Sequence, residues 1–252
     1  MSKTIRDALD IKLGNMITAV GAGGKTTFLK VLAKELIGQT APVILTTTTK
    51  MFSPEKHEEI LLISQKFSRE YFKERLLEKP VQNGFIYLGK EINKEGKMIG
   101  LESYQVDLLK GLFPFILVEG DGSLRKSFKA PGEHEPIIPT ETDLLCPVVG
   151  LKVIGKPLTG EFVHRPERVS SITGLRVGQI ITQEAITKVL CSSEGYYKKE
   201  YKYVPVLNQA DDLKNINDGL TIAEQIFAIL PIKKIMITSF IKRPYMIKIV
   251  DR

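Results

Sequence analysis

The residues that most clearly predict chemistry form a short glycine-rich run near the N-terminus, Gly21-Ala22-Gly23-Gly24-Lys25-Thr26-Thr27. An apolar stretch of strand composition precedes this run, and an amphipathic helical pattern follows it. Glycines let the backbone approach an anion closely, and the free N–H groups and dipole of a helix N-terminus favour negative charge. A lysine can then reach the terminal phosphates of a nucleotide while a threonine hydroxyl ligates Mg²⁺. The run therefore predicts a phosphate-binding loop, with Lys25 neutralising the phosphates and Thr26 on the metal.

This loop departs from the strict pattern G-x-x-x-x-G-K-[ST], which would place a glycine at position 19, where the chain has Ala19. The shorter form G-x-G-G-K-T resembles the loops of the Mur-type peptide ligases. An incidental glycine turn followed by Lys-Thr is the alternative, but the expected strand and helix lie where the mechanism needs them.

The second predicted strand ends in a threonine run that reaches Lys50. Ligands of open α/β sheets bind beyond the carboxyl ends of the strands, so Thr48 and Lys50 are expected to face the same crevice as Lys25. Threonine is also ordinary strand composition, and this alternative stays open.

Another predicted strand, Phe115–Val118, opens into Glu119-Gly120-Asp121. An apolar strand that ends in an acid is typical of nucleotide hydrolases, where the acid holds Mg²⁺ or orients the attacking water. Glu119 and Asp121 share one face if the strand continues through both. Either acid is a candidate metal ligand and catalytic residue beside Lys25, although acidic turns next to glycines are common.

After the stretch Tyr203–Leu207 comes Asn208-Gln209-Ala210-Asp211, which resembles the N-[KQ]-x-D motif of GTP-binding proteins. Asp211 would accept hydrogen bonds from guanine N1–H and its exocyclic amine, and Asn208 would hold the loop together. This motif favours GTP over ATP; the alternative is an Asx turn that leads into the next helix.

A long loop, Gly120–Thr142, and a later segment around residues 155–167 carry charged residues and two of the three histidines. Long loops in compact domains are usually functional or disordered. A second substrate site is therefore predicted here, although loop histidines are more often solvated and the spacing fits no known metal motif. Its candidate residues are Arg125, Lys129, His134, Glu135, Lys156, His164 and Arg165.

The elements that must position these residues follow from hydrophobic patterning. Nearly continuous apolar runs predict strands buried on both faces, at Asn15–Val20, Pro42–Thr47, Phe85–Leu88, Phe115–Glu119, Leu144–Val149, Tyr203–Leu207 and Lys234–Ser239. Helices are predicted at Lys25–Ile37, Arg69–Glu78, Ser103–Leu112, Pro166–Ile172, Gln183–Leu190 and Thr221–Ala228. Within an excursion at about 84–101, Gly89–Gly100 predicts a polar hairpin. The alternation indicates one α/β domain over residues 1–252, with three layers and a mostly parallel sheet.

The chain has 252 residues, of which 43% are hydrophobic and 26% charged, and a net charge of +7. No apolar run approaches the roughly 18–20 residues that span a bilayer, and no signal peptide is recognisable, so a cytoplasmic protein without membrane contact is expected. Two cysteines exclude a disulfide framework and a four-ligand zinc site, and Cys146 is expected to be a buried apolar residue. The basic C-terminal stretch alternates like a solvated strand face, so nucleic-acid binding is not expected.

The ordered motifs GAGGKTT, TTTTKM, VEGDGS, KAPGEHEPIIP, GKPL, VHRPE and NQAD, over about residues 14–215, resemble the YqeC family. These accessory proteins are assigned to selenium cofactor biosynthesis or to maturation of selenium-dependent molybdenum hydroxylases. Many relatives would have VEADGS where this chain has Gly120. The resemblance implies a cytoplasmic, P-loop NTPase-like protein, with a molybdenum hydroxylase or its maturation proteins as partners.

Together these observations predict a three-layer, P-loop NTPase-like protein that binds GTP, or less favourably ATP, with Mg²⁺ and hydrolyses it. A Mur-like ATP-dependent ligase or small-molecule kinase would use the same loop to activate an acceptor. A nucleotide-binding scaffold with negligible turnover is the third hypothesis.

Overall fold

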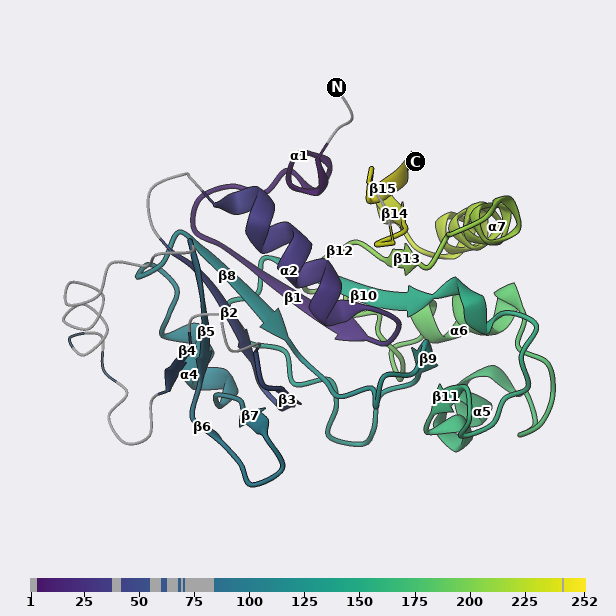
Figure 1. Cartoon of the computed structure of the whole chain (residues 1–252). Helices are drawn as coiled ribbons and strands as arrows, with labels where there is room; N and C mark the ends of the chain where they lie inside the picture. Colours follow the sequence, from purple (N-terminus) through teal and green to yellow (C-terminus); the bar gives the residue numbers. More distant parts are fainter. Residues whose placement is uncertain are drawn as a thin grey trace.

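The computed structural model describes residues 4–37, 42–54, 60–62, 68, 70, 84–241 and 243–252. Its centre is a ten-stranded sheet in the order β15-β14-β13-β10-β1-β8-β2-β5-β4, with β12 also paired to β10. The β14–β15 pairing is antiparallel, and the other pairings of this sheet are parallel. Figure 1 shows this sheet with helices on both sides. The predicted α/β fold with a mostly parallel central sheet is confirmed.

The strands of the central sheet are β1 (Asn15–Gly21), β2 (Val43–Thr47), β4 (Ile60–Leu62), β5 (Phe85–Gly89), β8 (Phe115–Glu119), β10 (Leu144–Gly150), β12 (Lys202–Tyr203), β13 (Val206–Asn208), β14 (Lys234–Thr238) and β15 (Met246–Asp251). Two small sheets contain β3 (Lys50–Phe52), β6 (Glu91–Ile92) and β7 (Lys97–Ile99), and β9 (Phe128–Lys129) with β11 (Val163–His164). The helices are α1 (Ile5–Leu9), α2 (Lys25–Leu36), α4 (Ser103–Asp107), α5 (Pro166–Thr173), α6 (Gln183–Cys191) and α7 (Leu213–Ile229), and a 3-10 turn, η1, spans Leu151–Val153.

Alternate residues of the central strands enter different hydrophobic cores. Phe28 of α2 packs in the same core as Val43 and Leu117, together with α1. On the opposite face Ile44 and Ile116 share a core with α4, and α6 and α7 cover the neighbouring half of that face. Strands buried on both faces require the near-continuous apolar sequences seen here.

The order of the strands places the glycine loop at a break in the sheet topology. From β1 the chain crosses through α2 to β2, skipping the position that β8 later fills, whereas β10 lies on the other side of β1. Connections that leave neighbouring strands in opposite directions open a crevice beyond their carboxyl ends, where ligands of such sheets bind. The fold thus places the ends of β1, β2 and β8 around one crevice.

Several elements differ from their predicted bounds. The predicted strand Tyr203–Leu207 is divided into β12 and β13 at Val204 and Pro205. Val204 N–H still donates to Leu145 O of β10 at 3.0 Å, but Pro147, the next residue of the ladder in β10, has no N–H to donate in return. Helix α4 stops at Asp107, short of the predicted Leu112. Helix α7 begins eight residues before the predicted Thr221, since Asp212 caps it through the Asn215 amide.

Several elements, among them α1, β4, β9, β11 and β15, were not predicted as such, and the predicted helix Arg69–Glu78 lies almost wholly outside the described residues. The predicted polar hairpin is confirmed as β6–β7, and β3 extends it to three strands. Cys146 is buried in β10, as expected. Among the described residues, no helix combines the length and apolarity needed to cross a membrane.

Candidate functional site

The glycine loop passes so close to neighbouring chain segments that side chains would not fit. Gly23 has φ +86, and a Cβ there would lie 2.3 Å from the Gly150 backbone nitrogen. Gly24 has φ +126, and its Cβ would lie 2.5 Å from Asn208 Nδ2. Both positive φ values and both close approaches require glycine. The loop is therefore held in one conformation by β10 and β13.

The backbone N–H groups of this loop fall into two sets. The amide of Gly21 donates to both carboxylate oxygens of Asp121, at 2.9 and 3.0 Å. Ala22 N–H donates to Val148 O and Gly23 N–H to Lys126 O, each at 2.9 Å. The next amides, residues 24–27, belong to the start of α2, which has no side-chain cap. Because the first N–H groups of a helix lack intrahelical partners, these are the amides that can bind a phosphate.

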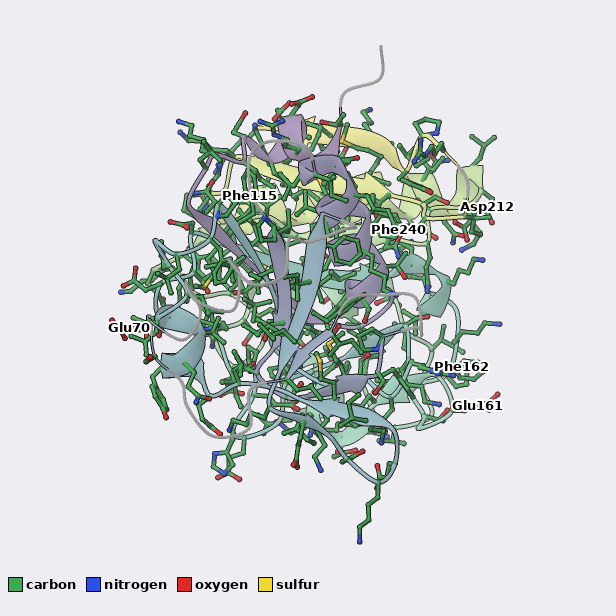
Figure 2. The ribbon with its side chains drawn as sticks, turned by 60° about the vertical axis from the view of Figure 1, so that its left-hand side comes forward. Glu70, Phe115, Glu161, Phe162, Asp212 and Phe240 are labelled. Carbon is green, nitrogen blue, oxygen red and sulfur yellow. The ribbon has the colours of Figure 1, made fainter. Side chains whose placement is uncertain are left out.

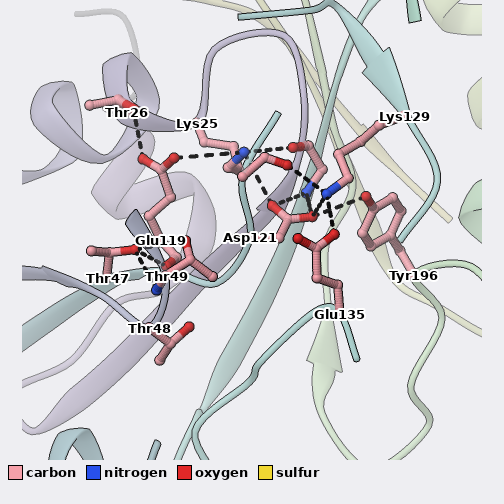
Figure 3. Close-up of polar contacts among 12 residues, drawn as sticks. Lys25, Thr26, Thr47, Thr48, Thr49, Glu119, Asp121, Lys129, Glu135 and Tyr196 are labelled. Atoms are coloured by element: carbon pink, nitrogen blue, oxygen red, sulfur yellow. Dashed lines mark hydrogen bonds and ion pairs between the residues drawn. The ribbon is translucent and has the colours of Figure 1, made fainter. Parts of the chain in front are cut away.

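Thr26, Lys25 and Glu119 meet where α2 begins and β8 ends (Figure 3). Thr26 Oγ1 donates to Glu119 Oε2 at 2.7 Å. Lys25 Nζ lies 3.7 Å from Glu119 Oε1 and donates to Gly21 O at 2.6 Å. A hydroxyl and a carboxylate in contact, beside an ammonium group, form an oxygen-ligand set suited to Mg²⁺ next to phosphate.

Asp121 lies behind this group in a buried ion network. The carboxylate of Asp121 is fully buried and pairs with Lys25 at 3.1 Å and Lys129 at 3.0 Å, while Tyr196 donates a hydrogen bond to it at 3.1 Å. Burial opposes the charge of Lys25, but Asp121 and Glu119 raise its pKa above the ordinary value. Burial and the Asp121 charge raise the pKa of Tyr196 well above its usual range. Asp121 therefore holds the loop from inside and has donors on both oxygens.

The network continues to the wall of the crevice through Glu135. Lys129 Nζ pairs with Glu135 at 2.7 Å, and Arg165 binds the same carboxylate through Nη1. Burial alone would raise the pKa of Glu135, but the hydrogen bonds from Arg165 and Lys129 lower it to about 2. His164 lies beside Lys129 across the β9–β11 pair, and burial and the charges of Lys129 and Arg165 lower its pKa.

A cavity of about 630 Å³ opens onto this arrangement, within the usual size range of small-molecule sites. Its lining includes the start of α2, Glu119, Glu135, His164 and Arg165. Of the five non-glycine residues with positive φ in the described part of the chain, four line this cavity: Leu124, Arg125, Arg165 and Gln209. Strained backbone is retained where the surrounding structure and the function require it.

The other predicted site residues are distributed unevenly around this cavity. Lys50 lines it, whereas Thr48 is turned away and donates to Ile137 O at 2.8 Å. His134 is exposed outside the lining, and so is Lys156, whose ammonium lies 5.6 Å from the Phe162 ring centroid. Arg125, Glu135, His164 and Arg165 are brought together, with Lys129 buried just behind them.

Asn208 ties the glycine loop to the neighbouring strand. Its Nδ2 donates to Gly23 O at 2.6 Å, and its Oδ1 accepts a hydrogen bond from Thr238 at 3.1 Å. Asp211 lies outside the cavity lining, where its carboxylate binds Lys152 at 2.6 Å and accepts from Ser239 at 2.5 Å. Although burial opposes it, these two partners lower the pKa of Asp211.

Several residues at the site were not predicted from the sequence, among them Tyr196, Lys97, Gln209 and Phe240. Tyr196 completes the buried network, and Lys97 brings the polar hairpin to the cavity. Gln209 lines the cavity, and its buried Oε1 has no hydrogen-bond partner in the described part of the chain. Phe240 lies against α2, 6.4 Å from the Phe28 ring centroid (Figure 2). No motif marks Tyr196, Lys97 or Phe240, which reach the site from segments distant in sequence. Gln209 lies within the Asn208–Asp211 motif, in which a role was predicted only for the first and last residues.

A family model and a curated protein both match this chain. A family model described as "YqeC protein" matches residues 17–167. A protein of Escherichia coli strain K12, named "Uncharacterized protein YqeC", is 32% identical over 200 residues, which cover 76% of this chain and 75% of that protein. The chain belongs to the YqeC family. The family segment contains the glycine loop, Glu119, Asp121 and Arg165, and it ends before Asn208. No solved structure matches the chain significantly.

Proposed function

We propose that this YqeC-family protein binds a purine nucleoside triphosphate with Mg²⁺ and hydrolyses it. The observation that carries the proposal is the contact between Thr26 Oγ1 and Glu119 Oε2 at 2.7 Å, directly beside Lys25 at the N-terminus of α2. Lys25 would neutralise the terminal phosphates, and the amides of residues 24–27 would bind their oxygens. Asn208 keeps the loop in register through Gly23.

The residues present fit a magnesium ion that is shared with the nucleotide. In the described part of the chain, no group of three or more His, Cys, Asp or Glu side chains can hold a metal by itself. Mg²⁺ usually binds through one or two protein oxygens plus substrate phosphates, so Thr26 and Glu119 are a sufficient set. The ion would offset the charge that develops on the phosphate oxygens. Asp121 is assigned to positioning, because Gly21, Lys25, Lys129 and Tyr196 already bind its carboxylate.

Preference for GTP would depend on Asp211. Its present partner Lys152 has a 53% exposed side chain, and exposed ion pairs contribute little, so guanine can replace the lysine at small cost. Gln209 Oε1 can accept an N–H from either purine and does not discriminate between them. If Asp211 reads guanine, Asp211→Ala should weaken GTP binding at least tenfold and leave ATP binding unchanged. Equal effects on both nucleotides would contradict the GTP preference.

The experiment for the main proposal is phosphate release from GTP and ATP with and without Mg²⁺. Thr26→Val should abolish the magnesium dependence, because the hydroxyl that faces Glu119 is lost while the buried network remains intact. Thr221→Val, an exposed change on α7, is the matched control and should behave as wild type. Turnover that is insensitive to Thr26→Val would contradict the proposal.

The resemblance to accessory proteins of selenium metabolism supports a role for this turnover in selenium cofactor biosynthesis or in maturation of a selenium-dependent molybdenum hydroxylase. Such a hydroxylase or its maturation proteins would then be partners. Deleting the gene should leave the hydroxylase inactive, and an intact copy, but not a Thr26→Val copy, should restore it. A fully active hydroxylase in the deletion strain would contradict this role.

One observation favours acceptor-dependent transfer, as in a ligase or kinase, as the second candidate. The cavity extends beyond Glu119 to His164 and Arg165, further than phosphate binding by α2 requires. Transfer predicts nucleotide turnover that is negligible until an acceptor is added. Steady phosphate release from purified protein alone would favour hydrolysis.

A further inference from the structure

One part of the cavity lining, outside the glycine loop and α2, is formed by residues from three separate segments. Lys50 and Phe52 come from β3 and Lys97 from β7, while Leu124 and Arg125 come from the loop after β8. We call these five residues the outer wall. Arg125 joins the loop after β8 to β3, because its guanidinium carbon lies 4.1 Å from the Phe52 ring centroid.

The turn that presents Arg125 is built from unfavourable residues. Lys126 N–H donates to Ser123 O at 2.9 Å, and the two central residues, Leu124 and Arg125, have φ values of +46 and +60. Turns with positive φ at both central positions strongly prefer Asn and Gly. A leucine and an arginine there disfavour the folded backbone, so their side chains must contribute something that an Asn-Gly turn would not.

These side chains give the outer wall an apolar and cationic character. Leu124 is 70% exposed and Phe52 is 53% exposed, although both face a cavity. A guanidinium that stacks on a ring keeps its N–H groups in plane for a carboxylate or phosphate. Lys50 and Lys97 add positive charge, and Lys97 is partly offset by Glu95 at 2.9 Å.

We infer that the outer wall binds a second small molecule, one that carries a phosphate or carboxylate group beside a flat apolar ring. The proposal rests on the proposed function in one respect, because the nucleotide phosphates are assigned to the α2 side of the cavity. Arg125, Lys50 and Lys97 would bind the anionic group, and Phe52 and Leu124 would contact the ring.

The test uses phenyl phosphate as the probe, on the full chain loaded with Mg²⁺ and a non-hydrolysable nucleoside triphosphate analogue. Calorimetry should show one probe per chain, bound more tightly than inorganic phosphate, which lacks the ring. Arg125→Ala should weaken binding of phenyl phosphate at least tenfold and change the affinity for the nucleotide analogue by less than twofold. Lys94→Ala, an exposed change at the turn of the same hairpin, is the control and should alter neither affinity.

A double variant separates binding from folding. Leu124→Asn with Arg125→Gly should raise the midpoint of thermal unfolding, because it supplies the residues that the turn prefers, and it should lose the probe. The inference is overturned if loaded protein binds no phenyl phosphate, or if Arg125→Ala binds it as wild type does. It is also overturned if Arg125→Ala weakens binding of the analogue as much as Lys25→Ala does, since the outer wall would then be part of the nucleotide site.

If the analogue does not bind wild-type protein, the proposed function fails, and phenyl phosphate is titrated into unloaded protein instead. Loss of binding in Arg125→Ala, with Lys25→Ala unaffected, would uphold the outer wall independently of the nucleotide. No binding, or loss in Lys25→Ala alone, would overturn it.

Discussion

Glu119 and Asp121 are two residues apart at the end of β8, yet they lie in different environments. Glu119 is 7% exposed; it lines the cavity and touches Thr26, with its other oxygen 3.7 Å from Lys25. Asp121 is fully buried and receives the Gly21 amide, two ammonium groups and the Tyr196 hydroxyl. The first carboxylate can exchange its partners for a ligand, whereas the second is committed to the protein.

The two acids therefore have different roles although their side chains are chemically alike. Glu119 is suited to binding a ligand, and Asp121 to holding the loop in place. Removing one member of a buried ion network leaves uncompensated charge and is strongly destabilising, whereas a carboxylate at a cavity surface can be rehydrated. Stability should therefore depend on Asp121, and turnover on Glu119.

Asp121→Asn should have the largest effect. The change leaves Lys25 and Lys129 without their shared counter-charge, so the free energy of unfolding should fall by about 3–5 kcal/mol. Urea unfolding followed by circular dichroism measures it. A loss below about 1 kcal/mol would mean that the network is not the framework of the loop.

Glu119→Gln should show the opposite pattern. The free energy of unfolding should fall by only about 1–2 kcal/mol, because glutamine keeps the shape of Glu119 and Lys25 keeps Asp121 as its counter-charge. Magnesium-dependent turnover should fall by about a hundredfold or more, as when a group that stabilises transition-state charge is lost. Unchanged turnover with a large loss of stability would reverse the roles of the two acids.

A third acid, Glu135, should make the free energy of unfolding depend on pH in the acid range. Its folded pKa of about 2 lies below the ordinary unfolded value of about 4.3, so its contribution is complete above about pH 5 and is lost as pH falls toward 2. Glu135→Gln should lower the free energy of unfolding by about 2 kcal/mol at neutral pH, and the difference from wild type should shrink between pH 5 and 2. The exposed neighbour variant Glu133→Gln should show little difference at either pH. A pH-independent difference for Glu135→Gln would contradict the ion pairing.

Lys152→Ala should give the smallest effect. Removing this lysine frees one oxygen of Asp211, so GTP should bind slightly tighter, by about 0.5 kcal/mol, with ATP unchanged. Parallel titrations of the two nucleotides measure the change. Weaker GTP binding would indicate that Lys152 itself contacts the nucleotide.

Much of this arrangement follows from local sequence. Near-continuous apolar runs predict the parallel sheet, and the glycine run before an amphipathic pattern predicts the loop, because both signals lie within a few residues. The separate environments of Glu119 and Asp121 do not follow, since they depend on Lys129 and Tyr196 from distant segments. The outer wall is equally hidden, because only the fold brings Phe52 to Arg125.

The most direct test of the central claim is calorimetric titration with GTP and ATP, each with and without Mg²⁺. Wild-type protein should bind at least one nucleotide in a magnesium-dependent manner. Lys25→Ala should weaken nucleotide binding by about 1.5–3 kcal/mol, or roughly ten- to a hundredfold. Thr26→Val, which leaves the buried network intact, should remove the magnesium dependence, and Lys94→Ala should bind as wild type. Absence of binding to wild-type protein, or wild-type, magnesium-dependent binding by both Lys25→Ala and Thr26→Val, would contradict the account.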